Sequence, residues 1–184
     1  MNNTKNIIDF VKQNRKLLLF SIISLIIFNK YIIIISLFIL FGLLGILSLQ
    51  VTRLIPHISI ETISSSAILI GYVWGWKLGL LFGISFGLYG YMKISLIKLK
   101  TIIAALLMGL CGVIAAIFAT LNYSFGYAFI FTFIIKMVLN QLIYPLVESN
   151  MTENFIHSFG DPLFNMLITF QLMQIIYKIL MFIT

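Results

Sequence analysis

The sequence predicts an all-α integral membrane protein, in which an additional N-terminal amphipathic and apolar helix precedes a bundle of six transmembrane helices. Of the 184 residues, 61% are hydrophobic and only 9% are charged, and the mean hydropathy is +1.13. A water-soluble fold of this size lacks the polar residues needed to cover so apolar a chain. The apolar runs are long and continuous, which favours spanning helices over the alternating strands of a membrane barrel.

The first segment, residues 1–30, is predicted to stand apart from a transmembrane domain at 31–184. Basic residues alternate with apolar ones over 1–16, a pattern typical of an interfacial helix, here placed on the cytoplasmic face. The apolar run 17–28 has only 12 residues. A run this short crosses a bilayer only if Lys16 or Lys30 extends its side chain to the interface.

The six predicted spans follow in order, separated by polar or basic segments. A hydrophilic connector at 51–66 follows the first span, and a second polar loop is expected at 148–162, before the last span. The sequence GYVWGWKLG predicts a tight hinge between the second and third spans. The spans are predicted at 31–50, near 64–76, near 77–92, near 102–121, near 125–147 and near 163–183.

Charge and cysteine content narrow the classes of function. The net charge of +7 is better explained by anchoring and topology in a cell membrane than by nucleic-acid binding. The distribution of Lys and Arg mildly favours seven spans, with 17–28 crossing, whereas segment length favours six. The single Cys111 permits no intrachain disulfide, and the two histidines lie in different loops, so neither a metal nor another cofactor is expected.

Polar residues inside predicted spans mark a candidate site, because such residues are costly in lipid. Lys136, Asn140, Tyr144 and Glu148 recur every four residues and share one helix face. With six spans, the outer ends of the last two helices and the first loop lie on the same side. The sequence therefore predicts an outward-facing substrate pocket formed by His57, Glu61, Lys136, Asn140, Tyr144, Glu148, Asn165 and Thr169.

The same polar residues have a second interpretation, a structural seam that holds two helices together. In that case Lys136 pairs with Glu148 or with a backbone carbonyl. If the pocket interpretation holds, the basic residues weakly favour an anionic or carboxylate-bearing ligand.

Small residues form a second pattern, because spans associate where backbones approach closely. These residues either pack helices within the monomer or form a groove for a partner membrane subunit. The predicted partner interface comprises Gly42, Gly45, Ser48, Gly75, Gly79, Gly83 and Gly87.

No catalytic motif occurs in the sequence, so an enzyme is not expected. The stretches FGLLGILSLQVTRLIPHISIETISSS and AILIGYVWGWKLGLLFGISFGLYG instead resemble the substrate-binding S components of energy-coupling factor (ECF) transporters. The likeness lies in a small-residue first span, an R-L-I-P loop, and a G-x-x-x-G-x-K-x-G turn that leads into a glycine-rich helix. The C-terminal stretch FNMLITFQLMQIIYKIL is also similar to the family.

The resemblance implies a multi-pass plasma-membrane subunit that captures a vitamin or other small nutrient at the outer face. It further implies docking of the first three spans on a transmembrane coupling subunit that two ATPases drive. Two alternatives remain open: a non-transporting membrane scaffold of the cell-shape machinery type, and a self-contained oligomeric transporter or channel.

Overall fold

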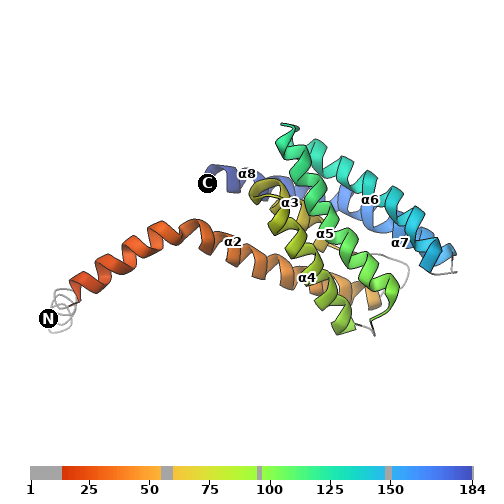
Figure 1. Ribbon diagram of the computed structural model, residues 1–184, viewed down its shortest axis with the longest axis horizontal. Helices are drawn as coiled ribbons and strands as arrows, with labels where there is room; N and C mark the ends of the chain where they lie inside the picture. The colour runs from red at the N-terminus through yellow and green to blue at the C-terminus, as the bar shows by residue number, and fades with distance from the viewer. Residues whose placement is uncertain (1–13, 55–59, 95–96, 148–150, 184) are drawn as a thin grey trace. The chain divides into compact units, whose positions relative to one another are not determined.

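The computed structural model describes residues 14–54, 60–94, 97–147 and 151–183, and within them it is all-α, without a strand (Figure 1). The chain divides into two compact units, Met1–Leu37 and Phe38–Thr184. The division falls inside the first described helix, α2 (Arg15–Leu54). Only the second unit contains more than one described helix, and it holds every described candidate residue.

Helix α2 continues through Asn29 and Lys30, the two residues that separate the apolar run 17–28 from the first predicted span. Neither residue is a strong helix breaker, and no Gly or Pro lies nearby. The predicted interfacial helix at 1–16 falls almost entirely outside the described residues.

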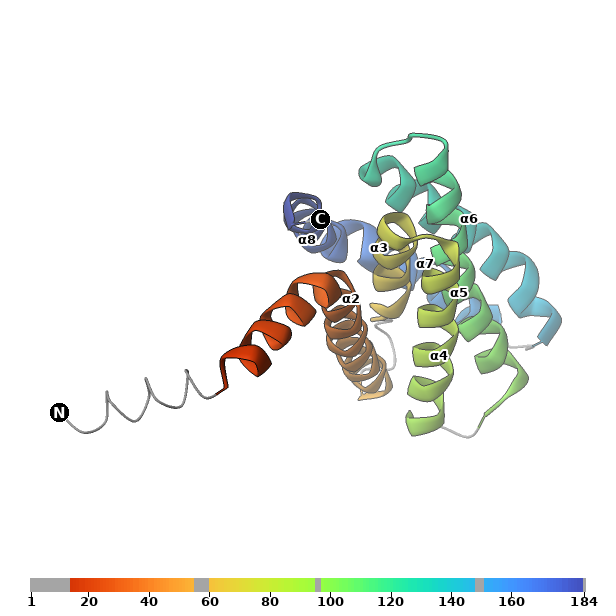
Figure 2. The same cartoon turned by 60° about the vertical axis from the view of Figure 1, so that its left-hand side comes forward.

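The helices of the second unit match four predicted segments to within a few residues. These are α3 (Ile63–Trp74), α4 (Trp76–Ile94), α5 (Leu99–Thr120) and α6 (Phe125–Val147). The predicted hinge lies at Gly75, whose φ of 96° favours glycine. In two views, α5 lies between α4 and α6 (Figures 1 and 2).

The predicted polar loop at 148–162 is wrong over most of its length, because residues from Met151 onward are helical. Helix α7 (Met151–Phe164) leads directly into a π-helical turn, η1 (Asn165–Thr169), and then into α8 (Phe170–Ile183). Pro162 cannot donate a helical hydrogen bond, and the wider turn begins three residues after it. Three polar residues of this helix, Asn154, Ser158 and Asp161, are buried in the bundle, so their polarity does not indicate a loop.

Helix α3 is the centre of the bundle, and every residue from Ile63 to Gly71 is buried. It packs against α4 and α5 where glycines from all three helices meet. A Cβ on Gly79 would lie 2.7 Å from the Cα of Gly71, and one on Gly112 would lie 2.6 Å from the Cα of Gly79. Glycine is therefore required here by the closeness of the backbones.

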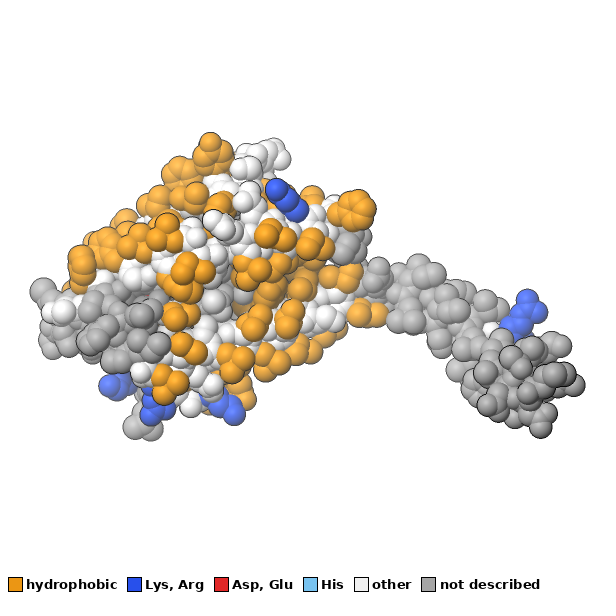
Figure 3. Space-filling view, turned by 180° about the vertical axis from the view of Figure 1, so that it is seen from behind, with side chains coloured by type: hydrophobic (Ala, Val, Ile, Leu, Met, Phe, Trp, Pro, Cys, Tyr) orange, Lys and Arg blue, Asp and Glu red, His pale blue; other side chains and the backbone are white. Residues whose placement is uncertain are grey.

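Within the described ranges, four helical segments are long and apolar enough to cross a membrane: Tyr31–Leu54, Leu99–Thr120, Phe125–Val147 and Ser158–Phe182. Helix α3 is apolar but shorter, since 12 residues extend only about 18 Å. Large hydrophobic side chains are exposed around the bundle, including Leu47, Ile117 and Leu142. Figure 3 shows hydrophobic side chains spread over one face of the second unit, with Lys and Arg side chains along its lower edge and also near its upper edge.

Candidate functional site

A buried ion pair lies at the centre of the candidate site. The Nζ of Lys136, in the middle of α6, is 2.8 Å from Oε2 of Glu61, which comes two residues before α3. Lys136 is 3% exposed and Glu61 is 1% exposed. Because an unpaired charge at such a position costs several kcal/mol, each residue requires the other. Lys136 thus pairs with Glu61, whereas the seam interpretation proposed Glu148, which lies outside the described residues, or a backbone carbonyl as its partner.

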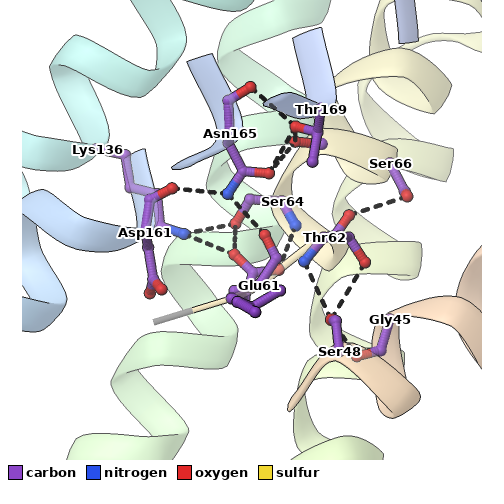
Figure 4. Close-up of polar contacts among 12 residues, drawn as sticks. Gly45, Ser48, Glu61, Thr62, Ser64, Ser66, Lys136, Asp161, Asn165 and Thr169 are labelled. Atoms are coloured by element: carbon purple, nitrogen blue, oxygen red, sulfur yellow. Dashed lines mark hydrogen bonds and ion pairs between the residues drawn. The ribbon is translucent and has the colours of Figure 1, made fainter. Parts of the chain in front are cut away.

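Ser64, in the first turn of α3, is hydrogen-bonded to both members of this pair (Figure 4). Its backbone N–H donates to Oε1 of Glu61 at 2.6 Å, and its hydroxyl donates to Oε2 at 2.6 Å. Lys136 in turn donates to the Ser64 hydroxyl oxygen at 2.6 Å. The carboxylate also lies at the N-terminus of α3, where the helix dipole favours negative charge.

The last helical segment joins the network through Asn165 and Thr169. The Asn165 amide donates to the carbonyl oxygens of Glu61 and Asp161, at 2.6 and 2.8 Å. The Ser65 hydroxyl donates to Oδ1 of Asn165 and lies 2.8 Å from the hydroxyl of Thr169. Asn165 and Thr169 are the two ends of the π-helical turn, a feature that often occurs at functional sites.

Residues 60–62, which lead into α3, are attached to α2 by two hydroxyl groups. Thr62 directs both its N–H and its hydroxyl at the Ser48 oxygen, each at 3.2 Å. The Ile60 N–H donates to the Thr52 hydroxyl oxygen at 2.8 Å. These bonds place the backbone of Glu61 so that its side chain points into the bundle.

The structure thus brings four predicted residues into one hydrogen-bonded network: Glu61, Lys136, Asn165 and Thr169 (Figure 4). Asn140 and Tyr144 lie one and two turns further along the same buried face of α6. Tyr144 packs with Ala104 and Leu107 of α5, and the Nζ of Lys100 is 5.6 Å from its ring centroid.

The other two predicted residues, His57 and Glu148, lie outside the described residues. Sequence reasoning missed Ser64 and Ser65, which it treated as part of a hydrophilic connector, and Ser158, which it placed in a loop. The spacing of Ser158, Asp161, Asn165 and Thr169 by three and four residues was the signal of an inward polar helix face.

The predicted partner interface is largely occupied by helices of the same chain. A Cβ on Gly83 would lie 2.5 Å from backbone atoms of Gly109, and one on Gly87 would meet Met108 and Ala105. Gly42 faces Phe86, Gly45 faces Ile63, and Ser48 is buried against Thr62. Gly75 alone of these predicted glycines has open space around it. The contacts favour packing within the monomer.

A groove lies near the α3–α4 hinge, apart from the buried polar network. It is an apolar groove of about 540 Å³ lined by residues of α3, the start of α4 and the end of α5, among them Tyr72, Trp76 and Ile117. The Tyr72 hydroxyl donates to the carbonyl oxygen of Tyr123 at 2.7 Å, which fixes one wall to the α5–α6 turn. The sequence analysis did not predict this groove.

The arrangement around Glu61 and Lys136 offers charge, amide and hydroxyl groups in an apolar bundle, a setting for orienting a small polar ligand. Compared with models of known protein families, with curated proteins and with solved structures, the chain matches none of them.

Proposed function

We propose that this chain is the substrate-binding S component of an ECF-type importer in the plasma membrane. In this proposal, α2 from Tyr31 onward, α3, α4, α5, α6 and the continuous segment α7–η1–α8 are the six spans. Residues 1–16 lie on the cytoplasmic side. The chain captures a vitamin or another small water-soluble nutrient from outside and delivers it through a transmembrane coupling subunit driven by two ATPases.

The observation that carries the proposal is the position of Glu61. Glu61, in the described residues 60–62 ahead of α3, is buried in the bundle and bonds to Lys136 of α6 and to Asn165 of the final helical segment. The resemblance to S components implies a pocket built from the same parts, the first loop and the last spans. The apolar surface of the bundle agrees with lipid as its surroundings.

The packing of the glycine faces inside the bundle limits which surfaces a coupling subunit could dock on. Since Gly79, Gly83 and Gly87 are covered by α5 and α3, docking would use the outward faces of the first three spans. The exposed side chains Leu43, Leu47 and Leu81 lie on such faces.

A scaffold function is the second candidate, and the closed state of the ion pair favours it. Glu61, Ser64 and Lys136 satisfy one another without a ligand, as expected of a structural polar seam. A scaffold binds no nutrient and tolerates loss of the polar face wherever the fold survives.

Uptake assays separate these functions. Cells expressing the chain, with and without coexpressed coupling subunit and ATPases, would be supplied with labelled water-soluble vitamins. We expect uptake of one vitamin only when the coupling proteins are present. Uptake without them would indicate a self-contained carrier, and no uptake of any vitamin in either strain would favour the scaffold.

A further inference from the structure

A buried polar stripe on α6 faces a second buried polar stripe on the α7–η1 segment. On α6, the buried residues Lys136, Asn140 and Tyr144 recur every four residues. On the facing segment, the polar stripe includes Ser158 and Asp161. The helices are consecutive, contact each other and run in opposite directions (Figure 1). Since α6 ends at Val147 and α7 begins at Met151, Asn140 and Ser158 each lie seven residues from the turn, and we expect the two to be near the same level.

The two halves of this polar interior differ in hydrogen bonding. Around Lys136, the carboxylate, ammonium and amide groups bond to one another. Around Asn140, the opposite holds: neither amide atom of Asn140 nor the hydroxyl of Ser158 has a hydrogen-bond partner among the described residues. Both side chains are 0% exposed. Buried polar groups are bonded in native proteins, so an unpartnered amide and hydroxyl at one level indicate a position for a polar molecule.

Among the described side chains, the charges around this position balance. Lys136 is neutralised by Glu61, and the other charged side chains described nearby are one cation, Lys100 above the Tyr144 ring, and one anion, Asp161 (Figure 4). A charged ligand would lose its hydration here without gaining an unmatched counter-charge. The basic residues of the sequence favoured an anion, but the one that reaches this interior from α6 is already paired.

The chemistry of the unpartnered groups indicates which kind of ligand would fit. A carboxamide presents a donor and an acceptor side by side, which matches a ligand edge bearing the same pair in reverse order. Tyr144, one turn from Asn140, packs with Tyr91 and the small Ala104, so the adjoining wall is aromatic and apolar. A flat ring stacks well on such a wall.

We propose that Asn140 and Ser158 bind an uncharged ring compound through an edge with an adjacent donor and acceptor, as in a cyclic amide or ureide. This inference rests on the proposed function and specifies its substrate class. The ion pair of Glu61 and Lys136 then forms one end of the site, and because its charges neutralise each other it does not bind a charged group of the ligand.

Equilibrium dialysis of the purified full chain in lipid nanodiscs tests the substrate class. The labelled probes are riboflavin, uracil and nicotinamide as uncharged compounds with an amide-type edge, nicotinate and pantothenate as anions, and thiamin as a cation. We expect binding of an uncharged probe, and no binding of nicotinate where nicotinamide binds. Tighter binding of an anion or the cation overturns this inference but leaves the proposed function intact. No binding of any probe counts against both.

Substitutions then test the residues. Asn140→Leu removes the unpartnered amide, so we expect a ligand-free Tm at least as high as that of the wild type, and an affinity lowered about tenfold or more. Ser158→Ala should lower affinity less and leave the fold intact. Thr132→Val is the matched control, since Thr132 is equally buried on the same face but donates to the Ala128 carbonyl. Unchanged affinity in both Asn140→Leu and Ser158→Ala overturns the inference.

Discussion

Removing one partner of the Glu61–Lys136 pair should destabilise the fold far more than removing both. The two groups are 2.8 Å apart, and each is at most 3% exposed. Lys136→Met leaves a buried carboxylate, and Glu61→Gln leaves a buried ammonium. Each change should lower the free energy of unfolding by about 3–5 kcal/mol, the usual cost of an uncompensated buried charge.

The double variant Glu61→Gln with Lys136→Met leaves no buried charge at the pair. We expect it to lie within about 2 kcal/mol of the wild type, so that the two single effects are strongly non-additive. Glutamine keeps one oxygen that can accept the Ser64 N–H bond now made to Oε1 of Glu61, and its amide group can donate to the Ser64 hydroxyl oxygen in place of the bond now made to Oε2, which preserves the N-terminus of α3.

Denaturant titration in mixed micelles, followed by far-UV circular dichroism, measures these free energies. Lys77→Met is the matched control, because Lys77 is exposed and its Nζ only lies 5.7 Å from the Trp76 ring centroid. Its loss should change stability by no more than about 1 kcal/mol. Single variants as stable as this control, or a double variant as unstable as the sum of the single effects, would refute the reasoning.

Three further predictions test packing, network and topology. Gly83→Ala should lower the free energy of unfolding by about 1–3 kcal/mol in the same titration, since its Cβ would meet the backbone of Gly109 at 2.5 Å. The control Gly126→Ala should be neutral, because its Cβ would lie no closer than 3.5 Å to Phe170. Equal effects of the two substitutions would contradict the packing. Asn165→Leu should lower the free energy of unfolding by about 2–4 kcal/mol, because it leaves the Glu61 and Asp161 carbonyls without their amide donor. A decrease below about 1 kcal/mol in denaturant titration would show that the network contributes little. Lys98→Cys and Ser124→Cys, made separately in a Cys111→Ala background, place a thiol at opposite ends of α5. We expect an impermeant maleimide to label them from opposite sides of the membrane. Labelling of both from the same side would contradict a spanning α5.

The helices of the second unit were largely predictable because apolar runs and their breaks are local features. The hinge at Gly75 and the bounds of α6 follow directly from composition and spacing. Helix α7 was not recognised, because polarity was taken as the sign of a loop. A polar face that turns inward has the same composition as a loop, and only its spacing of three to four residues distinguishes the two.

Part of the buried polar network was predictable in its membership but not in its pairing. The face shared by Lys136, Asn140 and Tyr144 follows from helical periodicity. The partner of Lys136 is 75 residues away in sequence, and nothing local distinguishes Glu61 from Glu148 as that partner. Likewise, glycine spacing shows that Gly79 and Gly83 allow close approach, but only the tertiary structure shows that the approaching helices belong to the same chain.

The location of the acidic residues supports a functional role for the polar interior. The chain has only five Asp and Glu residues, and two of them, Glu61 and Asp161, are buried with Lys136. Apolar residues of similar volume hold helices together at least as well as a buried ion pair does, and ionisable groups are costly within a membrane. Helix association alone therefore does not explain why three charges lie there. The proposed ligand site would explain it, because the fixed pair would align Glu61, α6 and the final helical segment around Asn140 and Ser158.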